Sequence, residues 1–261
     1  MFYKHTTAKW ANLFLFYRYY AIKLWRLAVV IPTYNESENL SVLIESLERT
    51  LKNIGMESSV IIVDDGSPDG TGEIAEELAE KYGNIVLHRN GKMGLGSAYK
   101  DGFTYALDRF NADVIVQMDA DSSHDPKYIR DMVKALREGK DVAVGSRRNE
   151  HGATVGWGYG RKSISSAANV VARIMCGLGV KDVTSGYRVF RSHCLRQINM
   201  NEIRSDGYAF QVETLYRLQQ SKFQICEVPI TFVDRREGKS KLNSTEMLKF
   251  LGTCARIMFA K

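Results

Sequence analysis

The sequence lacks the patterns that mark several classes of protein. Its four cysteines form no C-x-x-C pair, so neither a structural zinc site nor a disulfide framework is expected. A reducing, cytosolic setting is the default for such a chain. There is no G-K-S or G-K-T motif of a P-loop, no internal repeat and no low-complexity tract. With 44% hydrophobic and 25% charged residues, the chain is expected to be globular.

Long hydrophobic runs are also absent. A membrane-spanning helix needs about 20 apolar residues, and the nearest run, Trp10–Tyr17, is followed at once by Arg18. Residues 1–26 are basic and aromatic, which favours a segment lying in a lipid interface. A signal peptide is not expected, because no small-residue cleavage site follows before the first strand. The alternative is that translation starts further along the chain.

Charge is unevenly distributed over the 261 residues, a length that suffices for one large domain. Residues 1–26 carry five basic and no acidic residues, residues 27–144 carry 12 basic and 21 acidic, and residues 145–261 carry 19 basic and 9 acidic. We expect the front part to handle cations and the back part to meet an anion, such as nucleic acid, a phosphorylated ligand or a membrane surface. Chance variation along the chain is the alternative.

Apolar runs alternate with helical patterns from Leu27 onward. Repeating strand and helix units of this kind predict a doubly wound, mostly parallel sheet, an α/β fold. Asn35 with Glu38 predicts a capping box, and Ser67-Pro68 predicts the start of the next helix. Buried strands are expected at 27–33, 59–65, 84–88, 113–119 and 141–146, with helices between them.

The pattern is less regular after Ser146. Residues 147–160 are glycine-rich and are expected to form a loop. The remaining elements are expected as a helix at 162–177, a strand at 183–190, a helix at 208–219, a strand at 223–232 and an amphipathic C-terminal helix at 243–259.

Polar clusters follow three of the expected strands, where open α/β sheets bind ligands. They are P-T-Y-N-E after the first, D-D-G-S after the second and D-A-D after the fourth. In an extended chain Asp119 and Asp121 share one side, so they are expected to hold Mg²⁺ or Mn²⁺ between them. A solvated acidic turn is the alternative. Asp125, before Pro126, is expected to cap the following helix, and His124 has no predicted role.

Two other motifs near these strand ends are less specific. In D-D-G-S, alternation lets only one of Asp64 and Asp65 face the ligand, and a capped turn without a ligand is the alternative. The glycine run at 90–98 has the spacing G-x-x-G-x-G and follows the third strand, which disfavours a Rossmann dehydrogenase. It is better explained as a turn that brings the backbone close to the neighbouring site.

The ordered set of motifs resembles a known family. P-T-Y-N-E, D-D-G-S-P-D-G-T, G-L-G-S-A-Y, D-A-D, G-S-R, S-G-Y-R and V-P-I-T-F-V-D-R-x-x-G-x-S-K occur in this order between Leu27 and Lys241. The chain is similar to family 2 glycosyltransferases of the GT-A (Rossmann-like) fold, and in particular to dolichol-phosphate (polyprenol-phosphate) mannosyltransferases. The resemblance implies GDP-mannose as donor, dolichyl or polyprenyl phosphate as acceptor, and a divalent metal, Mg²⁺ or Mn²⁺.

The resemblance also implies roles for individual residues. Asp119, Asp121 and Arg147 would act in catalysis. Ser123 stands where some members have a glutamine, so it is a third candidate beside Asp119 and Asp121 for the metal. Arg147, Arg235 and Lys241 would bind phosphates of donor and acceptor. The nucleotide sugar would be met by Pro32, Tyr34, Glu36, Val63, Asp65, Asp119, Ala120 and Asp121.

The charge of the acceptor predicts the mechanism. A phosphate monoester has a second pKa of about 6 and is mostly a dianion at pH 7, so this nucleophile needs no general base. We expect in-line displacement at the anomeric carbon with inversion, while the metal offsets charge on the departing GDP.

The lipid acceptor that the resemblance implies would place the protein at the cytoplasmic face of a membrane. We expect peripheral attachment, with residues 1–26 as an interfacial segment, 27–241 as the catalytic domain and 242–261 as an amphipathic helix. Packing of this helix on the domain, or anchoring by a separate small membrane subunit, is the alternative.

Rival functions differ in donor or in class. The nearest is the same fold with UDP-glucose or a UDP-linked aminoarabinose. A processive synthase is disfavoured, since no Q-x-x-R-W motif occurs. Nucleic-acid binding is not expected, because the strand-end carboxylates would repel phosphates in the absence of a metal.

Overall fold

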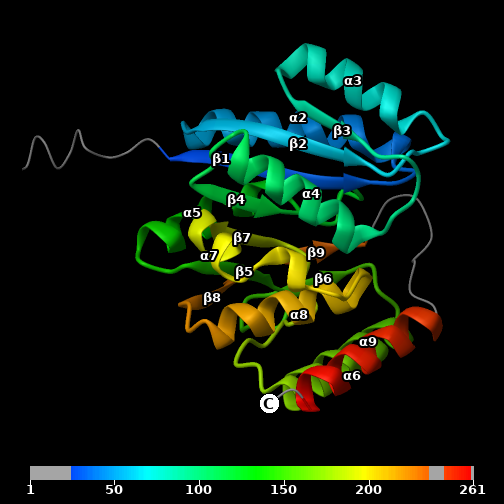
Figure 1. The fold of residues 1–261 in the computed structure, drawn as a ribbon, viewed down its shortest axis with the longest axis vertical. Helices are drawn as coiled ribbons and strands as arrows, with labels where there is room; N and C mark the ends of the chain where they lie inside the picture. The colour runs from blue at the N-terminus through cyan, green and yellow to red at the C-terminus, as the bar shows by residue number, and fades with distance from the viewer. Residues whose placement is uncertain (1–24, 235–243, 260–261) are drawn as a thin grey trace, which may run out of the picture.

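A seven-stranded sheet forms the centre of the molecule (Figure 1). The structure is a computed structural model that describes residues 25–234 and 244–259. The strand order is β3-β2-β1-β4-β7-β5-β8, and only the two pairings of β7 are antiparallel. The strands are β1 (Arg26–Thr33), β2 (Glu57–Asp64), β3 (Ile85–His88), β4 (Val114–Gln117), β5 (Val142–Ser146), β7 (Arg188–Arg191) and β8 (Ile225–Pro229).

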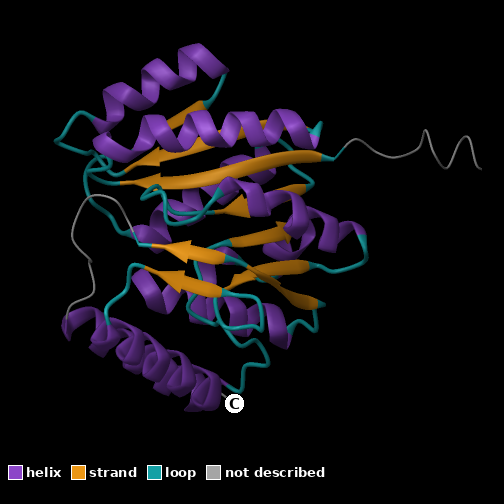
Figure 2. Cartoon of the chain, turned by 180° about the vertical axis from the view of Figure 1, so that it is seen from behind, coloured by secondary structure: helices purple, strands orange, loops and turns teal. Residues whose placement is uncertain are grey.

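Helices cover both faces of this sheet, as the two opposite views show (Figure 1 and Figure 2). One face is covered by α2, α3 and α5, the other by α4, α7 and α8, and α9 packs on both α8 and α6. The helices are α2 (Ser37–Ile54), α3 (Thr71–Tyr82), α4 (Leu95–Asp108), α5 (Ile129–Arg137), α6 (Tyr159–Cys176), α7 (Ser192–Gln197), α8 (Gly207–Gln220) and α9 (Ser244–Phe259). The expected α/β fold with a mostly parallel sheet and a C-terminal helix is confirmed.

The central strands are apolar on both faces because helices cover both. In β1, Ala28 and Val30 belong to the core under α4, whereas Leu27, Val29 and Ile31 belong to the core under α2. All five side chains are fully buried. This two-sided burial explains why the strand reads as a continuous apolar run rather than an alternating one.

Two helices begin later than expected. Asn35 has a left-handed φ of 57° and does not cap α2, which begins at Ser37. The Oγ of Ser67 donates to Asp64 Oδ1 and accepts from Asn35 N, so Ser67 closes a turn and α3 starts only at Thr71. By contrast, the prediction for Asp125 is confirmed, since its Oδ1 accepts from Lys127 N at the start of a short 3-10 turn, Pro126–Tyr128.

Three predictions for the back half are wrong. The first part of 183–190 lies outside any strand, and β7 begins only at Arg188. The run 223–232 is divided at Ile230 into β8 and β9 (Thr231–Val233). β9 pairs with β6 (Ala153–Val155), which lies inside the expected loop, and the two form a second small sheet.

The predicted interfacial segment falls almost wholly outside the described residues, since only Trp25 and Arg26 of residues 1–26 belong to them. Trp25 lies under the guanidinium groups of Arg137 and Arg191, at 5.9 and 4.8 Å from its ring centroid. Across residues 25–234 and 244–259, none of the helices combines the length and apolarity that crossing a membrane would require.

Candidate functional site

The carboxyl ends of β1, β2 and β4 border a cavity of about 450 Å³, here called the large cavity. The strand order reverses between β1 and β4, the position at which open α/β sheets bind ligands. Seven of the eight residues that the resemblance assigns to the nucleotide sugar line this cavity, namely Pro32, Tyr34, Glu36, Asp65, Asp119, Ala120 and Asp121. Val63, the eighth, is fully buried, and its Cγ2 would lie 3.1 Å from a Cβ placed on Gly102 of α4.

A second cavity of about 110 Å³, here called the small cavity, adjoins the first. It is lined by Ser123, His124 and Arg147, and by apolar side chains of α6 and α9 such as Ile164 and Phe250. Six residues line both cavities: Asp119, Asp121, Thr184, Gly186, Tyr208 and Glu246. The two carboxylates of the D-A-D motif therefore stand where the two cavities meet.

Asp119 is held at its side chain and at its backbone. Its Oδ1 accepts a hydrogen bond from Tyr99 Oη at 2.8 Å, and its N–H donates to His124 Nδ1 at 3.0 Å. Burial, and after it the charge of Asp119, raise the pKa of Tyr99 well above its ordinary value, so this phenol remains a donor. Burial lowers the pKa of His124, which favours the neutral ring that can accept at Nδ1.

Asp121 is placed by a turn and not by strand alternation. β4 ends at Gln117, and the chain then turns through Ser122, whose φ is 59°. The Oδ1 of Asp121 accepts from the N–H of Ser123 at 3.1 Å and from its Oγ at 2.5 Å. The expected pairing of Asp119 and Asp121 on one cavity is thus found, but the predicted physical reason was wrong.

The chemistry of this pair fits a divalent cation. Asp119 and Asp121 offer oxygen ligands, which Mg²⁺ and Mn²⁺ prefer. Asp119 forms no ion pair with any residue that the structure describes. Gly186 passes so close that a Cβ there would lie 3.3 Å from Asp119 Oδ2, so a larger residue would press on this carboxylate. The Ser123 hydroxyl donates a hydrogen bond to Asp121 and so lies beside the two carboxylates.

Asp65 organises the glycine run beside the large cavity. Its Oδ2 accepts from the N–H groups of Met93 and Gly94 at 3.2 and 3.1 Å, and its Oδ1 accepts from Arg89 Nη1 at 2.5 Å. Asp64 instead accepts from Thr33 Oγ1 and Ser67, so only one acid of the D-D-G-S motif faces the ligand side, as expected. The glycine run therefore serves as a turn that brings backbone to the site.

Arg147 lies in the small cavity, where it is paired with Asp182. Its Nε and Nη2 each donate to that carboxylate at 2.7 Å. Burial alone would lower the pKa of Arg147, but the hydrogen bonds and charge of Asp182 raise it, so the guanidinium stays charged. The group also faces the rings of Trp157 and Phe232, at 5.6 and 5.2 Å from their centroids.

Several lining residues were not predicted from the sequence. Arg161 pairs with Asp234 at 2.7 Å and lies over Trp157 at 4.3 Å. Like Tyr208 and Glu246, Arg161 lies on a helix of the back half and not at the end of a strand, so the rule about strand ends gives no signal for it. The predicted phosphate ligands Arg235 and Lys241 lie outside the described residues.

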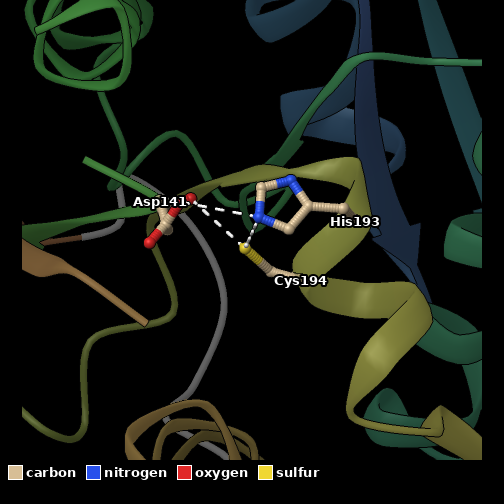
Figure 3. Close-up of side chains that lie close together, drawn as sticks. All are labelled: Asp141, His193 and Cys194. Carbon is tan, nitrogen blue, oxygen red and sulfur yellow. Dashed lines mark hydrogen bonds and ion pairs between the residues drawn. The ribbon is translucent and has the colours of Figure 1, made fainter. Parts of the chain in front are cut away.

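A different group of possible metal ligands lies where β5 begins and α7 starts. Its three side chains are shown in Figure 3. Asp141 precedes β5, and its Oδ1 is 3.5 Å from His193 Nε2, which is 3.6 Å from Cys194 Sγ. Burial, and then the charge of Asp141, raise the pKa of the Cys194 thiol to about 12, so the thiol is protonated. This mixed N, O and S group does not suit the hard cation expected at Asp119 and Asp121.

Comparisons with known proteins agree with this architecture. Residues 28–198 match the model of the family described as glycosyl transferase family 2. The undecaprenyl-phosphate mannosyltransferase of Micrococcus luteus is 44% identical over 219 residues, which cover 84% of this chain and 88% of that protein. The polyprenol monophosphomannose synthase of Mycolicibacterium smegmatis is 39% identical over 224 residues, which cover 85% and 83%.

Solved structures share the fold at lower identity. Glucosyl-3-phosphoglycerate synthase from Mycobacterium tuberculosis, in complex with phosphoglyceric acid, has a TM-score of 0.62 at 19% identity, covering 88% of this chain and 80% of that one. The same enzyme with Mn²⁺, UDP and glucosyl-3-phosphoglycerate has a TM-score of 0.59 at 21% identity, covering 90% and 78%. These likenesses show the fold alone. Together with the family model and the two mannosyltransferases, they confirm the resemblance seen in the motifs, and the chain belongs to glycosyl transferase family 2.

Proposed function

We propose that the chain transfers mannose from GDP-mannose to dolichyl or another polyprenyl phosphate, with inversion at the anomeric carbon. The observation that carries the proposal is that Asp119 and Asp121 line both the large and the small cavity. A donor in one cavity and an acceptor in the other would meet at this pair. The two relatives that are 44% and 39% identical, both named for mannose and a polyprenyl phosphate, support the choice of substrates.

The large cavity is assigned to the nucleotide sugar. A divalent cation, Mg²⁺ or Mn²⁺, would be held by Asp119 and Asp121, with Ser123 as the third predicted ligand, and would offset charge on the departing GDP. Tyr34 lies beside the guanosine in this proposal, and the ammonium of Lys92 sits 4.3 Å from its ring centroid. Asp65 supports the site by holding the backbone at Met93 and Gly94.

The small cavity is assigned to the acceptor phosphate and the first part of its lipid. Arg147 and Arg161 supply positive charge there, while Ile164, Met247 and Phe250 supply apolar walls. A cavity that combines cations with apolar side chains suits a phosphate joined to an isoprenoid chain. Arg235 and Lys241 remain predicted phosphate ligands on the strength of the motifs alone.

The reaction requires no proton acceptor on the protein. The acceptor phosphate has a second pKa of about 6 and is mostly a dianion at pH 7, and nearby guanidinium groups lower this pKa further. The protein's part is to orient this oxygen toward the anomeric carbon, on the side opposite the departing diphosphate. A donor and an acceptor that approach from the two adjoining cavities would suit in-line attack, which gives inversion.

A lipid acceptor requires contact with a membrane surface, and the outer faces of α6 and α9 suit it. These two helices lie side by side at one end of the molecule (Figure 1). We propose peripheral attachment at the cytoplasmic face, with residues 1–26 or a small membrane subunit as a further contact. The exposed apolar side chains there are Tyr159, Ile164, Val170, Ile174, Leu248, Leu251, Met258 and Phe259.

The test is a transfer assay with purified full-length protein and a polyprenyl phosphate in detergent. We expect label to pass from GDP-mannose to the lipid with Mg²⁺ or Mn²⁺ and to cease with EDTA. NMR of the anomeric centre should give the β configuration from the α-linked donor. Transfer from UDP-glucose or UDP-aminoarabinose, with none from GDP-mannose, would replace the donor, and an α-linked product would refute inversion.

A further inference from the structure

His124 is buried beside the proposed metal-binding pair, and the mechanism above gives it no task. Only 2% of the residue is exposed. Its ring stacks on Tyr187 with centroids 4.9 Å apart and meets the Phe232 ring edge-on at 5.7 Å. The ring is also a wall of the small cavity. This side chain is therefore held in one orientation in the wall of the small cavity, beside Asp119.

The N–H of Asp119 needs an acceptor, because the chain has left the sheet at this point. β4 ends at Gln117, and the next N–H, that of Met118, reaches Val30 O at 3.4 Å. A buried backbone N–H beyond the strand must find a partner outside the ladder. His124 Nδ1, five residues further along, accepts it at 3.0 Å. The imidazole thus closes the turn that carries both carboxylates.

The ring that makes this bond is itself fixed. The Tyr187 hydroxyl donates to the carbonyl of Asp125 at 3.0 Å, which holds the stacked ring of Tyr187 against the imidazole. The other end of Asp119 is held by Tyr99, whose hydroxyl donates to its carboxylate. Asp119 is accordingly clamped from two directions, by α4 at the side chain and by His124 at the main chain.

We propose that His124 is a positioning residue: its Nδ1 fixes the Asp119 main chain and so places the carboxylate for the donor diphosphate and its cation. The ligand named here rests on the proposed function, whereas the hydrogen bond does not. Partners that orient a metal ligand typically change metal affinity 10- to 100-fold when removed. The alternative role is packing alone, in which the ring merely fills space between Tyr187 and Phe232.

Three substitutions separate these roles. His124→Asn keeps an acceptor on Cγ, where Nδ1 is attached, but loses the ring. His124→Phe keeps the ring but loses the acceptor, and His124→Ala loses both. His193→Asn is the matched control, because His193 lies beside Asp141 and Cys194, outside both cavities, and 55% of its side chain is exposed (Figure 3).

Two measurements are made on the full-length proteins. Calorimetry gives the dissociation constant of GDP in the presence of Mn²⁺, which we expect to rise about 10-fold in the Phe and Ala variants and less than about 3-fold in the Asn variant. Hydrogen exchange of the peptide containing Asp119 should become faster in the Phe and Ala variants only. The His193→Asn control should match the wild type in both.

The opposite pattern overturns the proposal. If the Phe variant behaves as wild type while the Asn variant is weakened, the ring acts by packing. If all three variants equal the wild type, His124 positions nothing. Should the wild type bind no GDP with Mn²⁺, the proposed function fails, and exchange at Asp119, which needs no ligand, still decides whether His124 holds the turn.

Discussion

The two acids of the D-A-D motif are held in different ways, and this difference bears on their substitution. Asp119 is fixed by Tyr99 and His124, which come from outside the turn or from its far end. Asp121 is fixed by Ser123, two residues away, through both the N–H and the hydroxyl of that residue. Replacing Asp121 removes these two hydrogen bonds of the turn, so unfolding is measured beside activity to separate an effect on folding from one on transfer.

Asp121→Ala is expected to reduce mannose transfer by roughly 10³-fold, because one of two anionic ligands for the cation is lost. The melting temperature should change little. The assay is transfer from GDP-mannose with Mn²⁺, and circular dichroism follows unfolding. Asp131→Asn, an exposed acid on α5 away from both cavities, is the control and should stay active. Near-normal turnover by the Asp121 variant would refute the metal assignment.

Asp182 is expected to determine both stability and its dependence on pH. Its side chain is fully buried against Arg147. Burial alone would raise the pKa of Asp182, but hydrogen bonds from Arg147 and its charge lower it below the ordinary value. Asp182→Asn leaves a buried guanidinium without its counter-charge, which should lower the free energy of unfolding at pH 7 by roughly 3–5 kcal/mol.

The sign of the pH effect follows from that lowered pKa. The pairing contributes its full stability above the unfolded pKa of about 3.9, and the contribution is lost as pH falls through the lower folded pKa. Urea unfolding of wild type and Asp182→Asn is measured between pH 3 and pH 7. The difference between their free energies of unfolding should narrow only below about pH 4. A difference that is constant over this range would contradict the assignment.

At the scale of elements, α4 is packed directly on the strands that carry the large cavity. A Cβ at Gly102 would clash with Val30 Cγ1 and lie 3.1 Å from Val63 Cγ2. Gly102→Ala should lower the free energy of unfolding by about 1–3 kcal/mol through overpacking. Gly252→Ala is the matched control, because this helical glycine in α9 has open space around it. The control should stabilise by up to about 1 kcal/mol in urea unfolding. Equal effects of both changes would refute close packing of α4.

The elements also show what the sequence can predict. The apolar runs of β1, β2 and β4 identify buried strands because helices cover both faces, and the polar clusters at their ends locate the site. Helix starts were misplaced because Ser67 bonds to Asn35 in the loop after β1 and to Asp64 at the end of β2. The antiparallel direction of β7 could not be predicted, because the pattern of apolar and polar residues along a strand does not indicate its direction. Trp157 and Arg161 were missed because they lie just before and within α6, not at the end of a predicted strand.

At the scale of the whole molecule, the uneven charge matches the proposed division of labour. The acidic front part supplies Glu36, Asp65, Asp119 and Asp121 to the large cavity, where a cation is proposed. The basic back part supplies Arg147 and Arg161 to the small cavity, where a phosphate is proposed. The small cavity is walled by α6 and α9, so the lipid of a proposed acceptor would lie against these two helices, whose outer faces carry exposed apolar side chains.

This arrangement predicts that the exposed apolar faces of α6 and α9 bind the protein to membranes. Ile174 and Phe259 are 75% and 81% exposed, so charging them costs little in the folded protein. The double change Ile174→Glu and Phe259→Glu should reduce flotation with anionic vesicles at least about 10-fold, since each large side chain contributes about 1.5–3 kcal/mol when buried in lipid. Val42→Glu, at an exposed apolar residue on α2, is the control. Unchanged flotation of the double variant would show that these helices do not contact the membrane.

A shortened chain that begins at Trp25 tests residues 1–24 separately. Flotation equal to that of the full chain would exclude residues 1–24 from membrane attachment. Reduced flotation would show that they contribute to it.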